Sequence, residues 1–182
     1  MGNHVCPWWL AYTFDNPLRS LFHKPEDMFS LYVKAGMTVA DLGCGMGFFS
    51  LGLARMVKDN GRVLAIDLQP KMLEKTEKRA RKSGLSQIIS TRLCRKDDIG
   101  VRQPLDFALA FWVVHETPDI GNFLSQVYSA LKPGGILFIA EPKFHVSRGQ
   151  FKEEQNTAEA MGFVVKDLPR IAFSNALVFE KT

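Results

Sequence analysis

Cysteine is scarce in this chain, and the few cysteines are scattered. Cys6, Cys44 and Cys94 are the only three among 182 residues, and no two of them form a Cys-x-x-Cys pair. An odd number of cysteines without paired spacing argues against a disulfide framework and against a structural zinc site. His4 lies close to Cys6, but no second pair of ligands follows them, so we expect no metal centre.

Long apolar runs are absent as well. No stretch of the sequence approaches the roughly 20 apolar residues that a transmembrane helix needs. Residues 1–14 lack the basic flank and the uninterrupted apolar core of a secretory signal. Gly2 begins an N-myristoylation pattern, but Cys6 stands where that pattern requires Ser or Thr. We therefore expect a cytoplasmic protein without a membrane span.

Acidic residues are few in one region. Residues 55–96 hold 12 Lys or Arg against 4 Asp or Glu, in a chain whose net charge is +4. Such a basic segment could contact nucleic acid. However, a helix over 70–82 would gather four uncharged residues on one face and leave most basic side chains outside it. We therefore interpret the charge as a solvated helix face and expect no nucleic-acid partner. The four residues are Met72, Leu73, Thr76 and Ala80.

Several short apolar runs alternate with segments of helical length. The runs are rich in Val, Ile, Leu, Phe and Ala without strict alternation, which is typical of strands buried on both faces of a parallel sheet. A weaker strand is expected over 88–93. This order predicts an α/β fold with helices on both faces of the sheet. The main expected strands span 37–42, 62–67, 107–114 and 136–141, and the expected helices between them span 48–57, 70–82 and 119–131.

The two ends of the chain depart from this alternation. Residues 147–161 predict a helix, and 162–168 and 171–181 predict two strands with so short a link that they must run antiparallel. Near the start, one helix is expected over 17–33, with a break or restart at Pro25.

A glycine-rich loop follows the first expected strand. It contains Gly43, Gly45 and Gly47, with Asp41 two residues before the first glycine. Glycine lacks a Cβ, so such a loop can turn tightly and approach a ligand closely. The helix that follows favours negative groups at its start. Twenty residues beyond the loop, Asp67 ends the second strand, where an acid can accept hydrogen bonds from a ribose diol.

These two features also occur in dinucleotide-binding proteins, so a nicotinamide-dependent oxidoreductase is the alternative enzyme class. The dinucleotide pattern Gly-x-Gly-x-x-Gly would need glycine at position 48. Phe48 stands there instead, and it would be a poor neighbour for a pyrophosphate. The spacing therefore favours a ligand without phosphates.

Residues 39–47, Val-Ala-Asp-Leu-Gly-Cys-Gly-Met-Gly, resemble the first motif of the class I S-adenosylmethionine-dependent methyltransferases. Residues 65–73, 107–119 and 131–142 are similar to three later motifs of the family, in the same order. The resemblance implies a single doubly wound Rossmann-like α/β domain. Its seven-stranded sheet would have the order 3-2-1-4-5-7-6, with strand 7 antiparallel, which agrees with the expected strand pair at the end of the chain.

The resemblance also implies which residues bind the cofactor, S-adenosyl-L-methionine. Its methionine part would lie against the glycine loop, and its ribose against the end of the second strand. An acid after the third strand would meet the adenine, and both Asp97 and Asp98 are candidates. The expected cofactor-binding residues are Asp41, Gly43, Cys44, Gly45, Gly47, Asp67, Leu68, Asp97, Ala110 and Phe111. For Cys44, packing as a small apolar residue is the favoured interpretation.

The methyl group of this cofactor is already activated, so orientation of the two reactants can supply much of the acceleration. A general base is needed only if the acceptor must lose a proton. His115, which follows the fourth strand, is the first candidate, because imidazole titrates near neutral pH. Glu141 is the second candidate, and His145 would also lie on the acceptor side. Either candidate could instead have a purely structural role.

We expect two units, a helical lid over residues 1–35 and a cofactor-binding domain over 36–182. Trp8, Trp9 and Tyr12 concentrate aromatic surface near the start of the chain. A large apolar patch usually contacts something. The three side chains could cover the acceptor, pack on the sheet or form a dimer contact, and the oligomeric state stays open.

The acceptor is expected to be a small molecule. Family members that methylate amino groups of nucleobases often carry Asn/Asp-Pro-Pro-aromatic after the fourth strand, whereas residues 111–114 read Phe-Trp-Val-Val. A catalytically silent cofactor-binding subunit remains the non-enzymatic alternative.

Overall fold

The computed structural model describes residues 19–182. Seven strands form one sheet in the order β3-β2-β1-β4-β5-β7-β6, which is the predicted order. The strands are β1 (Thr38–Leu42), β2 (Arg62–Asp67), β3 (Ile89–Leu93), β4 (Leu105–Phe111), β5 (Leu131–Pro142), β6 (Phe163–Asp167) and β7 (Ser174–Lys181). The helices are α2 (Arg19–Phe22), α3 (Pro25–Phe29), α4 (Phe48–Val57), α5 (Pro70–Lys82), η1 (Val114–Glu116), α6 (Ile120–Ala130) and α7 (Arg148–Ala160).

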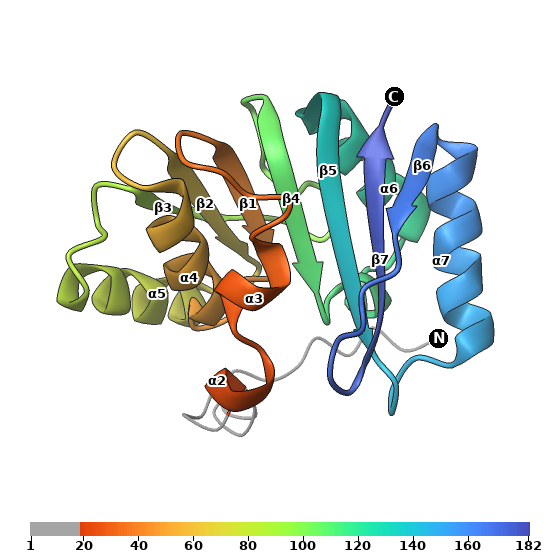
Figure 1. The fold of residues 1–182 in the computed structure, drawn as a ribbon, viewed down its shortest axis with the longest axis horizontal. Coiled ribbons are helices and arrows are strands. Elements are labelled where there is room, and N and C mark those ends of the chain that lie inside the picture. The colour runs from red at the N-terminus through yellow and green to blue at the C-terminus, as the bar shows by residue number, and fades with distance from the viewer. Residues whose placement is uncertain (1–18) are drawn as a thin grey trace.

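The first five strands run parallel, and β7 runs antiparallel to both of its neighbours. The link between β6 and β7 is too short for a crossover, so the two strands can pair only as a hairpin. This confirms the antiparallel end that the sequence predicts. All five parallel strands end at the same edge of the sheet, called the carboxyl edge below (Figure 1).

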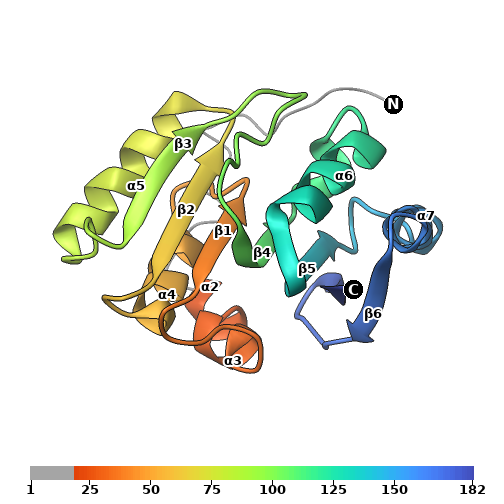
Figure 2. The same ribbon diagram turned by 90° about the horizontal axis from the view of Figure 1, so that it is seen from above.

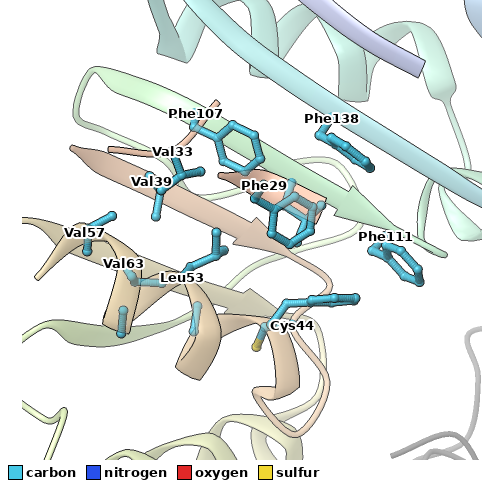
Figure 3. Packing of buried hydrophobic residues seen from close by; sticks show 14 of the residues in the cluster. Phe29, Val33, Val39, Cys44, Leu53, Val57, Val63, Phe107, Phe111 and Phe138 are labelled. Carbon is cyan, nitrogen blue, oxygen red and sulfur yellow. The ribbon is translucent and has the colours of Figure 1, made fainter. Parts of the chain in front are cut away.

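Helices cover both faces of the sheet (Figure 2). One apolar cluster joins α3, α4 and α5 to the sheet, and a second cluster joins α6 and α7 to its other face. Phe29 of α3 enters the first cluster, where its ring lies 5.8 Å from that of Phe107 and 5.1 Å from that of Phe138 (Figure 3). Both faces of the sheet are therefore buried, as the continuous apolar runs in its strands predict.

The expected helix over 17–33 is two short helices, α2 and α3, separated just before Pro25. Proline suits the first turn of a helix, so it begins α3 rather than interrupting a longer helix. A Cβ on Gly52 of α4 would lie 2.3 Å from Cγ of Pro25. The missing side chain thus allows α3 to pack directly on α4.

Helix α5 presents the face that the sequence predicts. Its buried residues are Met72, Leu73, Thr76 and Ala80. Arg81 forms an ion pair with Glu77, one turn earlier, at 3.7 Å. Helix α5 is therefore an ordinary amphipathic helix, and its basic side chains lie mostly on the exposed face.

Strand β4 ends three residues earlier than predicted. Trp112 has a φ of +59°, a left-handed conformation that is rare for a bulky residue and that ends the strand. Its backbone N–H donates to the carbonyl of Ala140 at 2.7 Å, and its indole Nε1–H donates to Oγ of Ser174 at 2.9 Å. These long-range bonds stabilise the turn at Trp112, and no sequence pattern within residues 107–114 predicts them.

Candidate functional site

The three glycines of the loop after β1 all have positive φ angles, of 71°, 53° and 80° along the chain. A Cβ on Gly43 would lie 2.6 Å from a methyl carbon of Val113, and one on Gly47 would lie 2.8 Å from Thr76. A Cβ on Gly45 would meet nothing within 4 Å. Two glycines therefore permit close packing, while the backbone at Gly45 borders open space.

Asp67, at the end of β2, is joined directly to this loop. Its Oδ2 accepts the N–H of Gly45 at 2.9 Å, and its Oδ1 accepts the N–H of Gln69 at 2.9 Å. Burial raises the pKa of the carboxyl group, while the N–H groups of Gln69 and Gly45 act in the opposite direction. Oγ1 of Thr76 donates to the carbonyl of Gly45 at 3.0 Å and fastens the loop to α5.

A cavity of about 170 Å³ lies beside the loop, at the carboxyl edge of β1, β2 and β4. Ligands of open α/β sheets bind at this edge. Its lining is mainly apolar, with a few polar groups. The lining residues are Leu42, Gly43, Gly45, Ile66, Asp67, Leu68, Gln69, Met72, Cys94, Arg95, Lys96, Ile99, Trp112, Val113, Glu116, Thr117, Pro118 and Phe123.

Four of the expected cofactor-binding residues line this cavity, namely Gly43, Gly45, Asp67 and Leu68. Three other expected residues do not line it, namely Asp41, Cys44 and Gly47. Cys44 is buried in the apolar cluster, and its Sγ lies 4.0 Å from Oγ1 of Thr76. Burial raises the pKa of its thiol, and a neutral side chain suits packing.

Asp41 is almost completely buried and accepts a hydrogen bond from Oγ of Ser50 at 2.5 Å. Burial raises the pKa of this carboxyl to about 6, although the bond from Ser50 favours its charged form. In the described structure Asp41 is thus hydrogen-bonded to the first turn of α4. Contact with the cofactor stays a prediction.

Neither candidate for the adenine lines the cavity. Asp97 is exposed, and its backbone carbonyl accepts hydrogen bonds from the side chains of Asn122 and Gln126. Asp98 accepts the N–H of Gly100 at 2.7 Å and forms an ion pair with Arg102 at 2.5 Å. The cavity wall after β3 consists of Cys94, Arg95, Lys96 and Ile99.

The end of β4 also differs in detail from the expectation. Ala110 and Phe111 are buried in the two apolar clusters and do not line the cavity. Trp112 and Val113 line it instead, because the left-handed turn at Trp112 redirects the chain. The roles of Ala110 and Phe111 beside the cofactor stay predictions.

Sequence reasoning missed several lining residues, among them Gln69, Met72, Trp112, Thr117 and Phe123. All five follow the carboxyl end of β2 or β4 in the chain. The open-sheet rule could have found the first four, since each lies within a few residues of a strand end. Phe123 comes from α6, and only the packing of that helix brings it to the site.

His115 and Glu141 meet at the same edge of the sheet. Phe111 pairs with Ala140 in the register of β4 and β5, so the residues after both positions are neighbours. Nδ1 of His115 forms a short hydrogen bond with Oε2 of Glu141, and Oε1 of Glu141 accepts the N–H of Val114 at 2.9 Å. Both predicted catalytic candidates therefore form one pair.

Glu141 is fully buried, whereas the side chain of His115 is 25% exposed. An ionised carboxylate can only accept, so Nδ1 of His115 carries the shared hydrogen and Nε2 is left for another partner. Burial lowers the pKa of His115, but the hydrogen bond and the charge of Glu141 outweigh it and raise the pKa above its usual value. The ring of His145 stacks on that of His115 with centroids 6.0 Å apart.

The N-terminal helices contact the end of β4. The ring of His23 lies 5.1 Å from that of Phe111 and 5.8 Å from that of Trp112. Its Nε2–H donates to the carbonyl of Ala172 at 3.0 Å, and burial lowers the pKa of the imidazole. The guanidinium of Arg19 lies over the rings of Phe111 and Trp112. The aromatic residues Trp8, Trp9 and Tyr12 lie outside the described residues.

Two negative findings apply to residues 19–182. None of their helices combines the length and the apolar character that crossing a membrane requires. They also contain no group of three His, Cys, Asp or Glu side chains that could hold a metal ion.

The sheet order and the helices on both faces define a Rossmann-like α/β domain, with a cavity beside the glycine loop at the carboxyl edge. Residues 33–172 match a family model described as a methyltransferase domain. The chain belongs to the S-adenosylmethionine-dependent methyltransferase family, whose cofactor is S-adenosyl-L-methionine.

Two curated relatives and one solved structure are similar to the chain. A demethylmenaquinone methyltransferase of Lactobacillus johnsonii is 29% identical over 84% of this chain and 66% of its own length. A ubiquinone biosynthesis O-methyltransferase of Methylocella silvestris is 32% identical over 64% of this chain and 44% of its own length. The chain thus spans about half to two thirds of these relatives. The crystal structure of a methyltransferase from Aquifex aeolicus matches 98% of this chain and 100% of its own, with a TM-score of 0.85 at 24% identity.

Proposed function

We propose that the protein transfers the methyl group of S-adenosyl-L-methionine to a hydroxyl group of a small molecule. The observation that carries this proposal is the His115–Glu141 pair, which lies at the same edge of the sheet as the glycine-loop cavity. The second relative supports it, because its name states O-methylation in ubiquinone biosynthesis. The name of the first relative supports a small quinone-type acceptor without stating which atom is methylated. An acceptor hydroxyl must lose a proton, so the pair would act as a general base.

The residues around the cavity fit the cofactor. The open space at Gly45 admits a ligand against the loop backbone, and the N–H groups at the start of α4 suit a carboxylate. Asp67 would accept hydrogen bonds from the ribose hydroxyls, and Leu68 and Met72 offer apolar contact to the nucleoside. Asp41 would act on the ammonium group from beneath the loop. When bound, the cofactor supplies a methyl group activated by a sulfonium.

The acceptor hydroxyl would donate its proton to Nε2 of His115. Its oxygen would then be able to accept the methyl group that the bound cofactor supplies. Glu141 holds the imidazole by Nδ1 and stabilises the positive charge that the ring gains. The exposed ring of His145 stacks on that of His115, with centroids 6.0 Å apart.

We also propose that, of residues 1–35, the part before α3 covers the acceptor, since Phe29 of α3 itself packs in the core. The packing of His23 and Arg19 against Phe111 and Trp112 supports this, because it places the start of the described residues against the end of β4. Trp8, Trp9 and Tyr12 would supply rigid aromatic area there. His145 would lie on the acceptor side, next to His115.

The test has two steps. Calorimetry should show binding of S-adenosylmethionine and S-adenosylhomocysteine, and none of NADH. Incubation with cofactor labelled in its methyl group, against panels of phenols, quinols, amines and thiols, should then label hydroxyl compounds. His115→Gln should lower turnover tenfold or more, the lower range for loss of a base, and leave cofactor affinity within a few-fold.

Binding of the cofactor without transfer to any acceptor would favour the silent subunit. Transfer to amines or thiols alone, at a rate indifferent to His115→Gln, would contradict both the hydroxyl acceptor and the role of the pair.

A further inference from the structure

Four aromatic side chains form a continuous surface at the carboxyl edge of the sheet. This surface, called the aromatic row below, consists of Phe22, Trp112, Phe144 and Phe173. The rings of Phe22 and Phe173 lie 5.5 Å apart, and those of Trp112 and Phe144 lie 5.7 Å apart. The backbone joins the two pairs, because the N–H of Lys143, next to Phe144, donates to the carbonyl of Phe173 at 2.9 Å. Segments far apart in the sequence therefore present one set of rings.

The three phenylalanines of the row are exposed. The exposed fractions of Phe22, Phe144 and Phe173 are 55%, 59% and 56%. Single apolar side chains on a protein surface are ordinary, whereas a contiguous apolar patch usually marks a binding site. The row therefore has the character of a surface that binds an apolar group.

Two members of the row have a strained backbone. Trp112 and Phe173 have φ angles of 59° and 60°, in the left-handed region that bulky residues rarely adopt. Such strain persists only where the surrounding structure fixes it, and it clusters at sites that bind ligands. At Phe173 burial does not offset the strain, because more than half of the side chain is exposed. The fold thus places this ring outward at a cost in free energy.

The row connects the cofactor cavity to the proposed base. Trp112 lines the cavity beside the glycine loop. The ring of Phe144 lies 5.1 Å from that of His145, which in turn stacks on His115. A ligand whose hydroxyl group reaches Nε2 of His115 therefore has its remaining atoms beside the row, which leads away from the base to the pair of Phe22 and Phe173.

We propose that the aromatic row binds an apolar chain of the methyl acceptor. The substrate class is then a hydroxyl compound that carries a hydrocarbon chain, with the hydroxyl group at His115 and the chain over the rings. The continuity of the row with the cavity and the base favours this occupant over a second copy of the chain or a membrane surface, neither of which needs to reach His115. The position of the hydroxyl group rests on the proposed function, whereas binding of the chain does not require methyl transfer.

Calorimetry with 4-alkylphenols, from 4-methylphenol to 4-octylphenol, tests the proposal. The protein is held with S-adenosylhomocysteine, which has no methyl group to transfer. Affinity should rise about two- to fourfold for each added methylene group, the range for its partial or full burial. Phe144→Ala and Phe22→Ala should each weaken binding of 4-octylphenol by about two- to tenfold, the scale of one aromatic contact, and change binding of 4-methylphenol much less.

Val164→Ala is the control for an exposed apolar side chain outside the row. Val164 is 52% exposed and pairs with Glu180, at the opposite end of β7 from Ser174, which follows Phe173. The control should bind every phenol as the wild-type protein does. Melting temperatures should stay close to that of the wild type in all three variants, because each removed side chain is more than half exposed.

The wild-type series is decisive without any variant, since affinity that does not rise with chain length would overturn the proposal. A rise that persists unchanged in Phe144→Ala and Phe22→Ala would also overturn it, because the chain would then bind elsewhere. A wild-type dimer that Phe144→Ala dissociates, measured by light scattering, would assign the row to a second copy. Binding to phosphatidylcholine vesicles that Phe144→Ala abolishes would assign it to a membrane surface. Failure of methyl transfer to every hydroxyl compound would leave the affinities for the phenols unchanged, so the two proposals fail separately.

Discussion

The backbone N–H of Gly45 donates a hydrogen bond to Oδ2 of Asp67 at 2.9 Å, which joins the glycine loop after β1 to the end of β2. The two segments that the sequence assigns to the methionine part and to the ribose of the cofactor are therefore one hydrogen-bonded unit. A change in either residue should affect both parts of the site.

Asp67→Ala should weaken binding of S-adenosylmethionine by roughly 1.5 to 3 kcal/mol, the scale for lost hydrogen bonds to a charged group. The physical reason is that the ribose hydroxyls and the Gly45 N–H lose the same acceptor. Isothermal titration calorimetry measures the loss. Asp59→Ala, an exposed change outside the site, should bind normally. Unchanged affinity in a folded Asp67→Ala protein would rule out the ribose role.

Alanine substitutions at three glycines should distinguish the cost of backbone strain from the cost of contacts made by the new Cβ. Gly43, Gly45 and Gly84 have φ angles of 71°, 53° and 70°, so each substitution costs about 1–2 kcal/mol of stability through the left-handed backbone. Gly84→Ala should cost only this, because nothing lies within 4 Å of the new Cβ. Gly45→Ala should add a loss of cofactor affinity, and Gly43→Ala a further loss of stability against Val113.

Urea unfolding and calorimetry on the same three proteins check this ranking. Equal stability of Gly43→Ala and Gly84→Ala would show that the contact with Val113 relaxes freely. Normal cofactor affinity in Gly45→Ala would show that the cofactor does not approach the backbone there.

Asp41 should make the protein less stable as pH rises from about 4 to about 6. Its pKa is raised to about 6 in the folded state, mainly by burial, so the folded protein holds this proton more tightly than the unfolded chain does. Stability from this group is therefore present at low pH and is lost as pH rises through the folded pKa. Two pKa units correspond to about 2 to 3 kcal/mol.

Asp41→Asn removes this titration and keeps an acceptor for Ser50. Relative to wild type, the variant should gain stability between pH 4 and pH 7, as measured by chemical unfolding at several pH values. The loss of stability with rising pH should be smaller in Asp41→Asn than in wild type. It should not disappear, because burial also raises the pKa values of Asp67 and Glu154. A constant difference between the two proteins across this range would refute the assignment.

Trp9→Ala should lower turnover on the true acceptor by about tenfold or more and leave cofactor affinity within a few-fold. The reason is that a lid excludes water and aligns the acceptor without touching the cofactor. Steady-state kinetics, calorimetry and the melting temperature test this together. A tryptophan in a core would typically cost 3 to 5 kcal/mol on truncation, so early melting with full activity would mean that the aromatic residues are core.

The sequence by itself determined the features that depend on short-range rules. The period of α5 identified its four buried residues, and the short link before β7 required an antiparallel pair. The glycine loop, Phe48 and Asp67 pointed to the cofactor class, because the chemistry of that site depends on residues at regular spacings along one chain segment.

Only the tertiary structure decided what depends on contacts across the chain. β4 stops at Phe111 because Trp112 adopts a left-handed conformation, stabilised by its bonds to Ala140 and Ser174, which no local pattern reveals. His115 and Glu141 become a pair through the register of β4 and β5. Side-chain periodicity fixes which face a residue occupies, but the partner it meets depends on how separate elements pack, and that is a property of the whole fold.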